Sequence, residues 1–267
     1  MTDADADFDP SEFRLRVELE RHHYWHVHRK RVLFDALERA CPDRSARLLE
    51  LGAGVGSVAT YFNARGRHVD YSDVHGEALE LAEGAARAEL GPGFTRHFLR
   101  LDVTRDEIPE GYLGYCMFDV LEHLTPHERV LTKLRSALDA RSKGFVLLSV
   151  PAFSLLWSPW DELERHKRRY TKASLRRVAE AAGFRVEEQR YFFLPLFFAA
   201  LGVKGVRLLR RATVGPPPKS DIRGMLETQS SPALDRAMLG LLAPERRWLA
   251  RGDLMLGTSL LATLRPV

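Results

Sequence analysis

The chain has few of the features that mark secreted or membrane proteins. Its 267 residues include only two cysteines, Cys41 and Cys116, too few for a disulfide framework. The uncharged apolar stretch 191–203 has thirteen residues and is interrupted by Pro195, whereas a membrane-spanning helix needs about 20. No charge of one sign dominates, because 40 Lys and Arg stand against 36 Asp and Glu. We therefore expect a reduced, cytoplasmic protein without a transmembrane segment or an extended nucleic-acid surface.

The N-terminal region is acidic and then rich in histidine. In residues 1–10 aspartate alternates with small residues, without the positive and apolar build of a signal peptide, so we expect a disordered leader. Residues 11–40 fit two helices, the second from about His26. Four histidines lie between His22 and His28, but no cysteine or carboxylate stands at zinc-ligand spacing beside them. They indicate a solvated helix face, and we expect no metal.

Apolar strands and amphipathic helices alternate over the rest of the chain. This order favours an α/β fold in which helices cover both faces of a parallel sheet. Strands are expected at about 47–51, 67–73, 98–103, 115–118, 144–150, 184–190 and 257–264. We expect the core at 46–190, a helical insertion at 191–251 and the final strand of the core within 252–267.

The most informative segment is the glycine-rich turn after the first strand. An apolar strand is followed by Glu50 and by glycines at alternating positions, Gly52, Gly54 and Gly56. Glycine lets a ligand approach the backbone and tolerates positive φ. A dinucleotide fingerprint needs a glycine where Ser57 stands, and a carboxylate at Glu50 repels a pyrophosphate. The turn therefore indicates a ligand with a positive charge and ribose hydroxyls but no phosphate, such as S-adenosylmethionine (SAM).

This turn resembles motif I of the class I SAM-dependent methyltransferases, E/D-x-G-x-G-x-G. Three later segments resemble the following motifs in order: the second strand ending in Asp73, the third-strand segment with Asp102, and the D-V-L-E-H-L box 119–124. The resemblance implies a seven-stranded Rossmann-like sheet with an antiparallel last strand beside strand six. It also implies SAM as cofactor and S-adenosylhomocysteine (SAH) as product.

The resemblance assigns cofactor roles by position. Asp73 aligns with the acid that binds the ribose hydroxyls, so Asp70 is expected to be an exposed strand residue. Asp102 is expected to accept from the adenine amino group, beside the backbone N–H of Val103. Within the core, the predicted cofactor residues are Glu50, Leu51, Gly52, Ala53, Gly54, Gly56, Asp73, Val74, Asp102, Val103, Phe118 and Asp119.

The segment 151–171 resembles a bacterial methyltransferase subgroup that carries V-P-A, L-W-S, D and H-K-R-R-Y in the same order. That resemblance implies an N-terminal lid over 11–45, in which Tyr24 packs near the methionine moiety and Arg29 or Arg31 pairs with its carboxylate. It also implies an aromatic acceptor site made by Trp25, His26, Phe153, Trp157, Trp160 and Tyr170. The simpler alternative is that the tryptophans are hydrophobic latches and 166–169 is a solvated helix start.

Methyl transfer is an in-line displacement, so alignment and desolvation can supply most of the rate. A base is needed only when the acceptor must lose a proton. His123 is the first candidate and His166 the second, with Tyr170 and Asp161 as orienting groups. His123 is expected to begin the helix after strand four, where it could equally cap a carbonyl.

The segment 191–251 leaves the acceptor class open. The apolar residues 191–203, followed by arginines, fit a helix on the sheet edge or over the active site, or an interfacial helix on anionic lipid. Two further helices are expected at 232–242 and 245–250, on either side of Pro244. We expect a small, hydrophobic, natural-product-type acceptor, as in secondary metabolism, and a lipid-linked or glycan intermediate at the membrane surface is the alternative.

Other functions have less support in the sequence. A nucleic-acid amino methyltransferase would carry Asn/Asp-Pro-Pro-aromatic after strand four, where this chain has D-V-L-E. A nicotinamide-dependent oxidoreductase is disfavoured by Glu50 and Ser57. A non-catalytic protein that keeps the SAM fold stays open. Nothing in the sequence indicates the oligomeric state.

Overall fold

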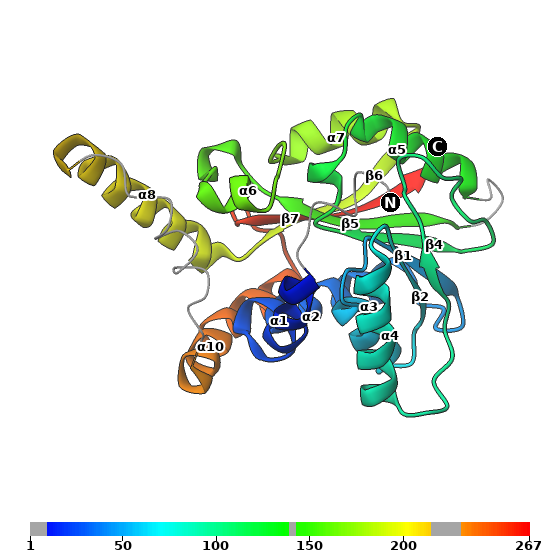
Figure 1. Ribbon diagram of the computed structural model, residues 1–267. Coiled ribbons are helices and arrows are strands. Elements are labelled where there is room, and N and C mark those ends of the chain that lie inside the picture. Colours follow the sequence, from blue (N-terminus) through cyan, green and yellow to red (C-terminus); the bar gives the residue numbers. More distant parts are fainter. Residues whose placement is uncertain (1–9, 139–142, 215–230) are drawn as a thin grey trace.

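The computed structural model describes residues 10–138, 143–214 and 231–267. One seven-stranded sheet has the order β3-β2-β1-β4-β5-β7-β6 (Figure 1). Its strands are β1 Arg47–Leu51, β2 His68–Asp73, β3 Phe98–Arg100, β4 Gly114–Phe118, β5 Phe145–Pro151, β6 Phe184–Phe192 and β7 Ser259–Pro266. The pairs among β1 to β5 are parallel, whereas β7 runs antiparallel to both β5 and β6. The predicted fold class, with its antiparallel last strand, is confirmed.

Helices cover both faces of this sheet, as Figure 1 shows. They are α1 Pro10–His22, α2 Tyr24–Ala40, α3 Ser57–Asn63, α4 Gly76–Leu90, α5 His127–Ala137, α6 Pro159–Leu163, α7 Lys172–Ala181, α8 Leu194–Val214 and α10 Pro232–Leu249, with 3-10 turns η1 Leu121–His123 and η2 Ser154–Leu156. Alternate residues of β4 enter two separate cores: Tyr115 and Met117 pack with α5 and α7, and Cys116 and Phe118 with α2 and α3. Burial on both faces explains the continuous apolar strands.

The parallel strands bring distant loops to one edge. β1 lies between β2 and β4, so the chain leaves the carboxyl ends of these strands in opposite directions across the sheet. Ligands of open α/β sheets bind at such a point. The loops after Leu51, Asp73, Phe118 and Pro151 therefore form the edge where a site is expected.

Two predictions for the N-terminal region and one for β2 need correction. Nearly all of the predicted leader 1–10 lies outside the described residues, and α2 begins at Tyr24 instead of about His26. The histidines do not form a solvated face, because His28 is buried and its Nε2 lies 2.9 Å from Oε1 of Glu245. Asp70 is buried rather than exposed, since Arg47, Tyr112 and the backbone N–H of His97 all donate to it.

The insertion also differs from prediction. β6 extends to Phe192, and α8 then begins at Leu194 with Pro195 in its first turn, where proline is tolerated. A single helix, α10, runs through Pro244 in place of the two expected helices. Pro244 is exposed, while Leu242 and Glu245 on either side are buried. Their packing outweighs the missing hydrogen bond of the proline, which costs about 3 kcal/mol in a helix interior.

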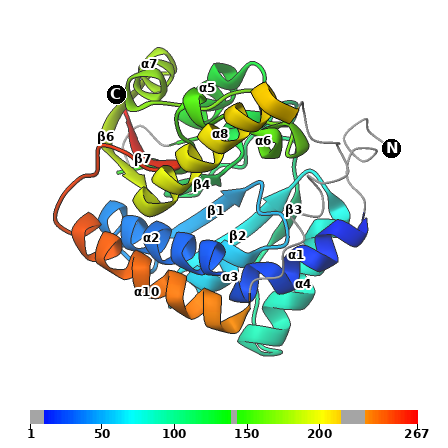
Figure 2. The same cartoon turned by 90° about the vertical axis from the view of Figure 1, so that its left-hand side faces the viewer.

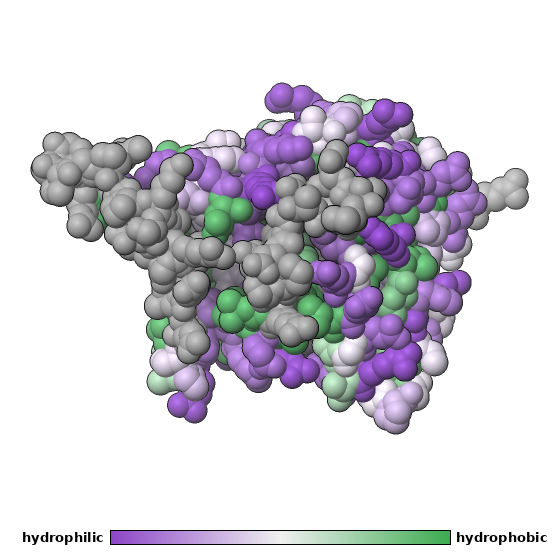
Figure 3. Space-filling model, viewed as in Figure 1, coloured by the Kyte–Doolittle hydropathy of each residue, from purple (hydrophilic) through white to green (hydrophobic). Residues whose placement is uncertain are grey.

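Helix α8 extends away from the sheet (Figure 1), and it contacts η2. Figure 2 shows the same helix from the side. Its outer side chains include the exposed Phe198, Val203 and Val206. The face seen in Figure 3 is mostly hydrophilic, with hydrophobic residues gathered in a few areas near its middle. None of the helices within the described residues has both the length and the apolar character to cross a membrane.

Candidate active site

The glycine turn joins β1 to α3 through three residues with positive φ, Gly52, Gly54 and Gly56. A Cβ on Gly52 would lie 2.5 Å from Cγ2 of Val120, and one on Gly56 would lie 2.7 Å from Cβ of Ala82. These two glycines are therefore required by packing against the protein itself. A Cβ on Gly54 would meet no atom within 4 Å. Open space adjoins the backbone at this glycine, as a bound ligand requires.

Glu50 lies on β1 just before this turn and is almost completely buried. Its Oε2 is buried without a hydrogen-bond partner. Burial raises the pKa of Glu50 to about 8, although the nearby Arg29 guanidinium acts in the opposite direction. A buried carboxyl group with an unsatisfied oxygen is suited to accept a cationic ligand.

The acids after β2 and β3 have different surroundings. Asp73 is buried, and its two oxygens accept from the N–H groups of Gly54 and His75 at 2.8 and 2.9 Å. It thereby fixes the glycine turn and keeps lone pairs for a ligand, and Val74 follows it. Asp102 accepts from the N–H and the hydroxyl of Thr104 at 2.9 and 2.6 Å. Burial alone would raise the pKa of Asp102, but these hydrogen bonds lower it.

The first turns of α2 bring Arg29 to the end of β4. Its Nη2 lies 2.6 Å from Oδ2 of Asp119, a residue with φ of 57° that follows Phe118. The guanidinium also lies 5.4 Å from the ring centre of Trp25, and its Nε is buried without a partner. Trp25 stacks on Phe193 at 5.5 Å. The lid residue Arg29 and Asp119, which directly follows β4, were predicted separately and are in contact.

The other predicted residues of this region lie around that contact. The Tyr24 ring packs 4.4 Å from His23 and its backbone N–H donates to Asp235. The His26 ring lies edge-on to Trp25 at 4.8 Å, and burial lowers the pKa of His26 well below its usual value. Leu51 and Val103 are buried, and Ala53 is half-buried and donates its N–H to Ser72.

Helix α1 covers the glycine turn. Phe13 packs in one cluster with Val55 of the turn and Ala78 of α4. At the next turns of α1, Arg16 reaches Glu164 just after α6, with Nη2 2.8 Å from Oε1. One helix therefore connects the side of the site near α4 with the side formed by the loops after β5.

A polar cluster stands on that second side. His123 is in η1, not at the start of α5, and its ring centre lies 4.9 Å from that of His166. His166 Nδ1 lies 2.9 Å from Oδ1 of Asp161, to which Arg169 donates through Nε and Nη2 at 2.6 and 3.0 Å. The segment 166–169 is thus neither helical nor merely solvated. Burial, and then the neighbouring His166, lower the pKa of His123 to about 4.

Two carboxyl groups of this cluster have pKa values shifted in opposite directions. Burial acts to raise the pKa of Asp161, but hydrogen bonds from His166 and Arg169 outweigh burial and hold this pKa well below its usual range. Glu122 is completely buried, and this burial together with Asp119 raises its pKa well above the usual value. Sequence reasoning quoted Glu122 within the D-V-L-E-H-L box without giving it a role.

The predicted acceptor aromatics do not share one environment. Phe153 stacks on Tyr191 at 4.7 Å and touches Phe197 at 5.5 Å. Trp157 is half-buried, whereas Trp160 is exposed on α6. Tyr170 is 2 % exposed, and its hydroxyl donates to the carbonyl of Leu121 at 3.4 Å. Contrary to expectation, this burial gives Tyr170 a place in the core and leaves its hydroxyl no access to an acceptor.

Comparison with known proteins identifies the class. A family model described as a methyltransferase domain matches residues 24–189, more than half of the chain, so the chain belongs to that family. Together with the fold, this places it among the class I SAM-dependent methyltransferases. No curated protein matches the chain.

Solved methyltransferase structures share the fold. A proposed methyltransferase of Haloferax volcanii, in complex with the activator Trm112, is 14 % identical and has a TM-score of 0.61, over 98 % of this chain and 96 % of that one. A proposed sarcosine dimethylglycine methyltransferase of Galdieria sulphuraria is 16 % identical, with a TM-score of 0.58 over 90 % and 86 %. Magnesium protoporphyrin IX methyltransferase of Synechocystis PCC 6803, with bound SAH, is 19 % identical, with a TM-score of 0.50 over 61 % and 77 %.

Proposed function

We propose that the protein binds SAM at the glycine turn and transfers the methyl group to a hydrophobic acceptor held by the loops after β4 and β5. The observation that carries the proposal is a pair of buried atoms without partners, Oε2 of Glu50 and Nε of Arg29. An ammonium group satisfies the first and a carboxylate the second. The amino-acid end of SAM carries both groups, so the residues present fit this cofactor.

The other cofactor roles follow from the edge of the sheet. Gly54 leaves space beside the backbone, and Asp73 has free lone pairs for ribose hydroxyls. Asp102 and Val103, after β3, are assigned to the adenine. We assign the surrounding wall to Leu51, Gly52, Ala53, Gly56, Val74, Phe118, Asp119 and Tyr24, which lie in or beside the loops at this edge or in the lid.

When bound, SAM supplies a methyl group made electrophilic by the sulfonium. The chain contributes alignment and exclusion of water, through α1 and α2 acting as a lid over the turn. Trp25, Phe153 and Trp157 provide apolar contact on the acceptor side, where His123 and His166 also stand. The methyltransferases of similar fold are named for acceptors as different as magnesium protoporphyrin IX and sarcosine. The acceptor class proposed for this protein therefore rests on its own side chains.

A methyl-transfer assay tests the proposal. Purified protein and SAM are incubated with hydrophobic aromatic alcohols and amines, and SAH release and the mass of each acceptor are measured. We expect SAH and a methylated product with at least one hydrophobic acceptor. Tight SAM binding without SAH release from any acceptor would instead support the non-catalytic alternative.

A second acceptor class is favoured by a specific surface. Exposed apolar side chains gather on neighbouring elements: Phe198, Val203 and Val206 on α8, Leu155 on η2 and Trp160 on α6. Lys204 lies among them and donates to the carbonyl of Leu155. An apolar surface with a cation is typical of proteins that rest on anionic lipid, where a lipid-linked acceptor would be met.

Vesicle flotation distinguishes the two classes. If the acceptor is lipid-linked, the protein floats with anionic vesicles, F198E stays in solution, and the control M255E, altered at another exposed apolar residue, still floats. Unmodified protein that stays wholly in solution would remove the membrane alternative.

A further inference from the structure

Three potential metal ligands meet between two loops of the acceptor side. Glu122 and His123 belong to η1, and His166 lies between α6 and α7. One ligand atom from each lies within 4.8 Å of the other two. Oε1 of Glu122 and Nε2 of His166 lie 3.9 Å apart. Two atoms that each bind one ion at about 2.1 Å are at most about 4.2 Å apart, so this spacing already suits a shared ion.

Glu122 gives the strongest indication that a ligand belongs here. Its side chain is completely buried, and neither of its carboxylate oxygens has a hydrogen-bond partner. The distance of 3.9 Å to His166 is too long for a hydrogen bond. A buried carboxyl group without partners is costly, and binding of a cation by both oxygens would remove that cost.

Each of the two histidines has a hydrogen-bond partner of the kind that commonly supports a metal-bound imidazole. Asp161 lies 2.9 Å from Nδ1 of His166, which assigns the proton to Nδ1 and the lone pair to Nε2, the atom facing Glu122. Arg169 neutralises and fixes this aspartate. A carboxylate behind a histidine is the common outer partner of a metal-bound imidazole. The ring of His123 is similarly held by the backbone of Arg165.

We propose that Glu122, His123 and His166 bind one divalent transition-metal ion. Two imidazole nitrogens and one carboxylate suit Zn²⁺, Mn²⁺ or Co²⁺ better than Mg²⁺ or Ca²⁺, which prefer oxygen ligands. Because three protein ligands leave coordination positions open, the ion also offers a place for a water molecule or an acceptor atom. All three proposed metal ligands are side chains of this protein, so the metal site does not depend on which acceptor binds.

This inference changes two expectations from the sequence. No metal was expected, because the histidine-rich run 22–28 lacks a cysteine or carboxylate at zinc-ligand spacing. His123 was expected to act as a base, but an imidazole that binds a metal through its lone pair cannot accept a proton. An acceptor proton would then leave to water.

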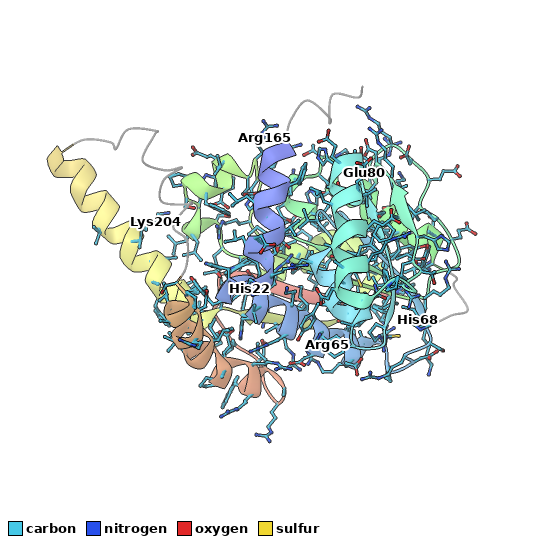
Figure 4. The ribbon with its side chains drawn as sticks, turned by 60° about the horizontal axis from the view of Figure 1, so that its bottom comes forward. His22, Arg65, His68, Glu80, Arg165 and Lys204 are labelled. Atoms are coloured by element: carbon cyan, nitrogen blue, oxygen red, sulfur yellow. The ribbon has the colours of Figure 1, made fainter. Side chains whose placement is uncertain are left out.

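The test uses the full chain, freed of metal with a chelator and titrated with Zn²⁺ or Co²⁺. Bound metal is measured by elemental analysis, and Co²⁺ binding by its visible absorption spectrum. We expect one equivalent per chain, at least tenfold weaker binding in H166A and E122Q, and a smaller loss in D161N. H68A is the matched control, because His68 is exposed and lies on the opposite side of the molecule from Arg165, the neighbour of His166 (Figure 4).

Circular dichroism and SAH affinity show whether each variant is folded, and H123A replaces H166A or E122Q if either fails to fold. Failure of SAH to bind would contradict the proposed function, but it would not affect the interpretation of the metal titration. Absence of stoichiometric metal in the unmodified protein would overturn the site. Equal Zn²⁺ affinity in unmodified protein and H166A would also overturn it, because the ion would then be bound elsewhere.

Discussion

At the scale of single residues, the glycines of the turn have different tasks. Gly56 is packed against Ala82 and Tyr71, whereas Gly54 borders open space. Both have positive φ, so alanine at either position costs about 1–2 kcal/mol of backbone strain. The difference between them therefore comes from what a methyl group would touch.

We predict that G56A loses about 1–3 kcal/mol more stability than G54A, because its Cβ would stand 2.7 Å from Cβ of Ala82. G54A should stay folded and lose SAH affinity, since its methyl group occupies the ligand's space. Urea denaturation and calorimetric titration measure the two effects. Equal stability losses would show that the packing at Gly56 is looser than described.

The buried carboxyl group of Glu50 makes the stability of the ligand-free protein depend on pH. With a pKa of about 8 in the folded state and 4.5 as reference, the folded chain keeps a proton that the unfolded chain releases. The contribution of Glu50 to stability therefore falls as pH rises from about 4.5 to 8 and is constant above. The slope is at most about 1.4 kcal/mol per pH unit.

We predict that E50Q removes this slope. The stability of E50Q relative to the unmodified protein should rise through pH 4.5 to 8, as measured by urea denaturation at several pH values. Glu20 also has a raised pKa, mainly through burial, but it is present in both proteins and its effect cancels in the difference. Parallel pH profiles would show that Glu50 is ionised in the folded protein.

At the scale of elements, Glu245 of α10 links three parts of the chain. It pairs with His28 of α2 and accepts from the N–H groups of Phe193 and Leu194, at the start of α8. The first N–H groups of a helix have no partner within the helix, so this carboxylate acts as a cap from another element.

We predict that E245A lowers the free energy of unfolding by about 2–4 kcal/mol, because buried N–H groups and His28 lose their acceptor. E245Q, which keeps one acceptor oxygen, should lose less. D253A is the control, since Asp253 is half exposed and its pair with Lys172 is worth about 1 kcal/mol or less. A loss no larger in E245A than in D253A would contradict the capping role.

The elements also show how far sequence reasoning reaches. The strands and the glycine turn are predictable because continuous apolar runs and the special φ of glycine are local properties of the sequence. Pro244 misled the prediction because the packing that keeps α10 intact comes from α2, which is remote in sequence. The pairing of Asp161 with His166 was anticipated, but the approach of His166 to Glu122 depends on how η1 meets the loop after α6. The burial of Tyr170 likewise depends on tertiary packing.

At the scale of the whole molecule, α1 is the connection that closes the site. Phe13 packs against the glycine turn, and Arg16 pairs with Glu164 on the acceptor side. The pair is partly exposed, so it contributes about 1 kcal/mol or less. We predict that E164A leaves global stability nearly unchanged and accelerates SAH dissociation by up to about fivefold, as measured by stopped-flow displacement. An unchanged dissociation rate would mean that α1 does not hold the ligand.

The central claim is that the ammonium of a SAM-type ligand binds the carboxyl group of Glu50, and calorimetric titration with SAH at pH 7 tests it most directly. Since ligand-free Glu50 is protonated at this pH, a bound cation should expel close to one proton, measured as a dependence of the heat on the buffer. We predict stoichiometric SAH binding with proton release, affinity at least tenfold lower in E50Q, and no release in that variant. SAH binding of equal strength and equal buffer dependence in E50Q, or no binding to the unmodified protein, would contradict the account.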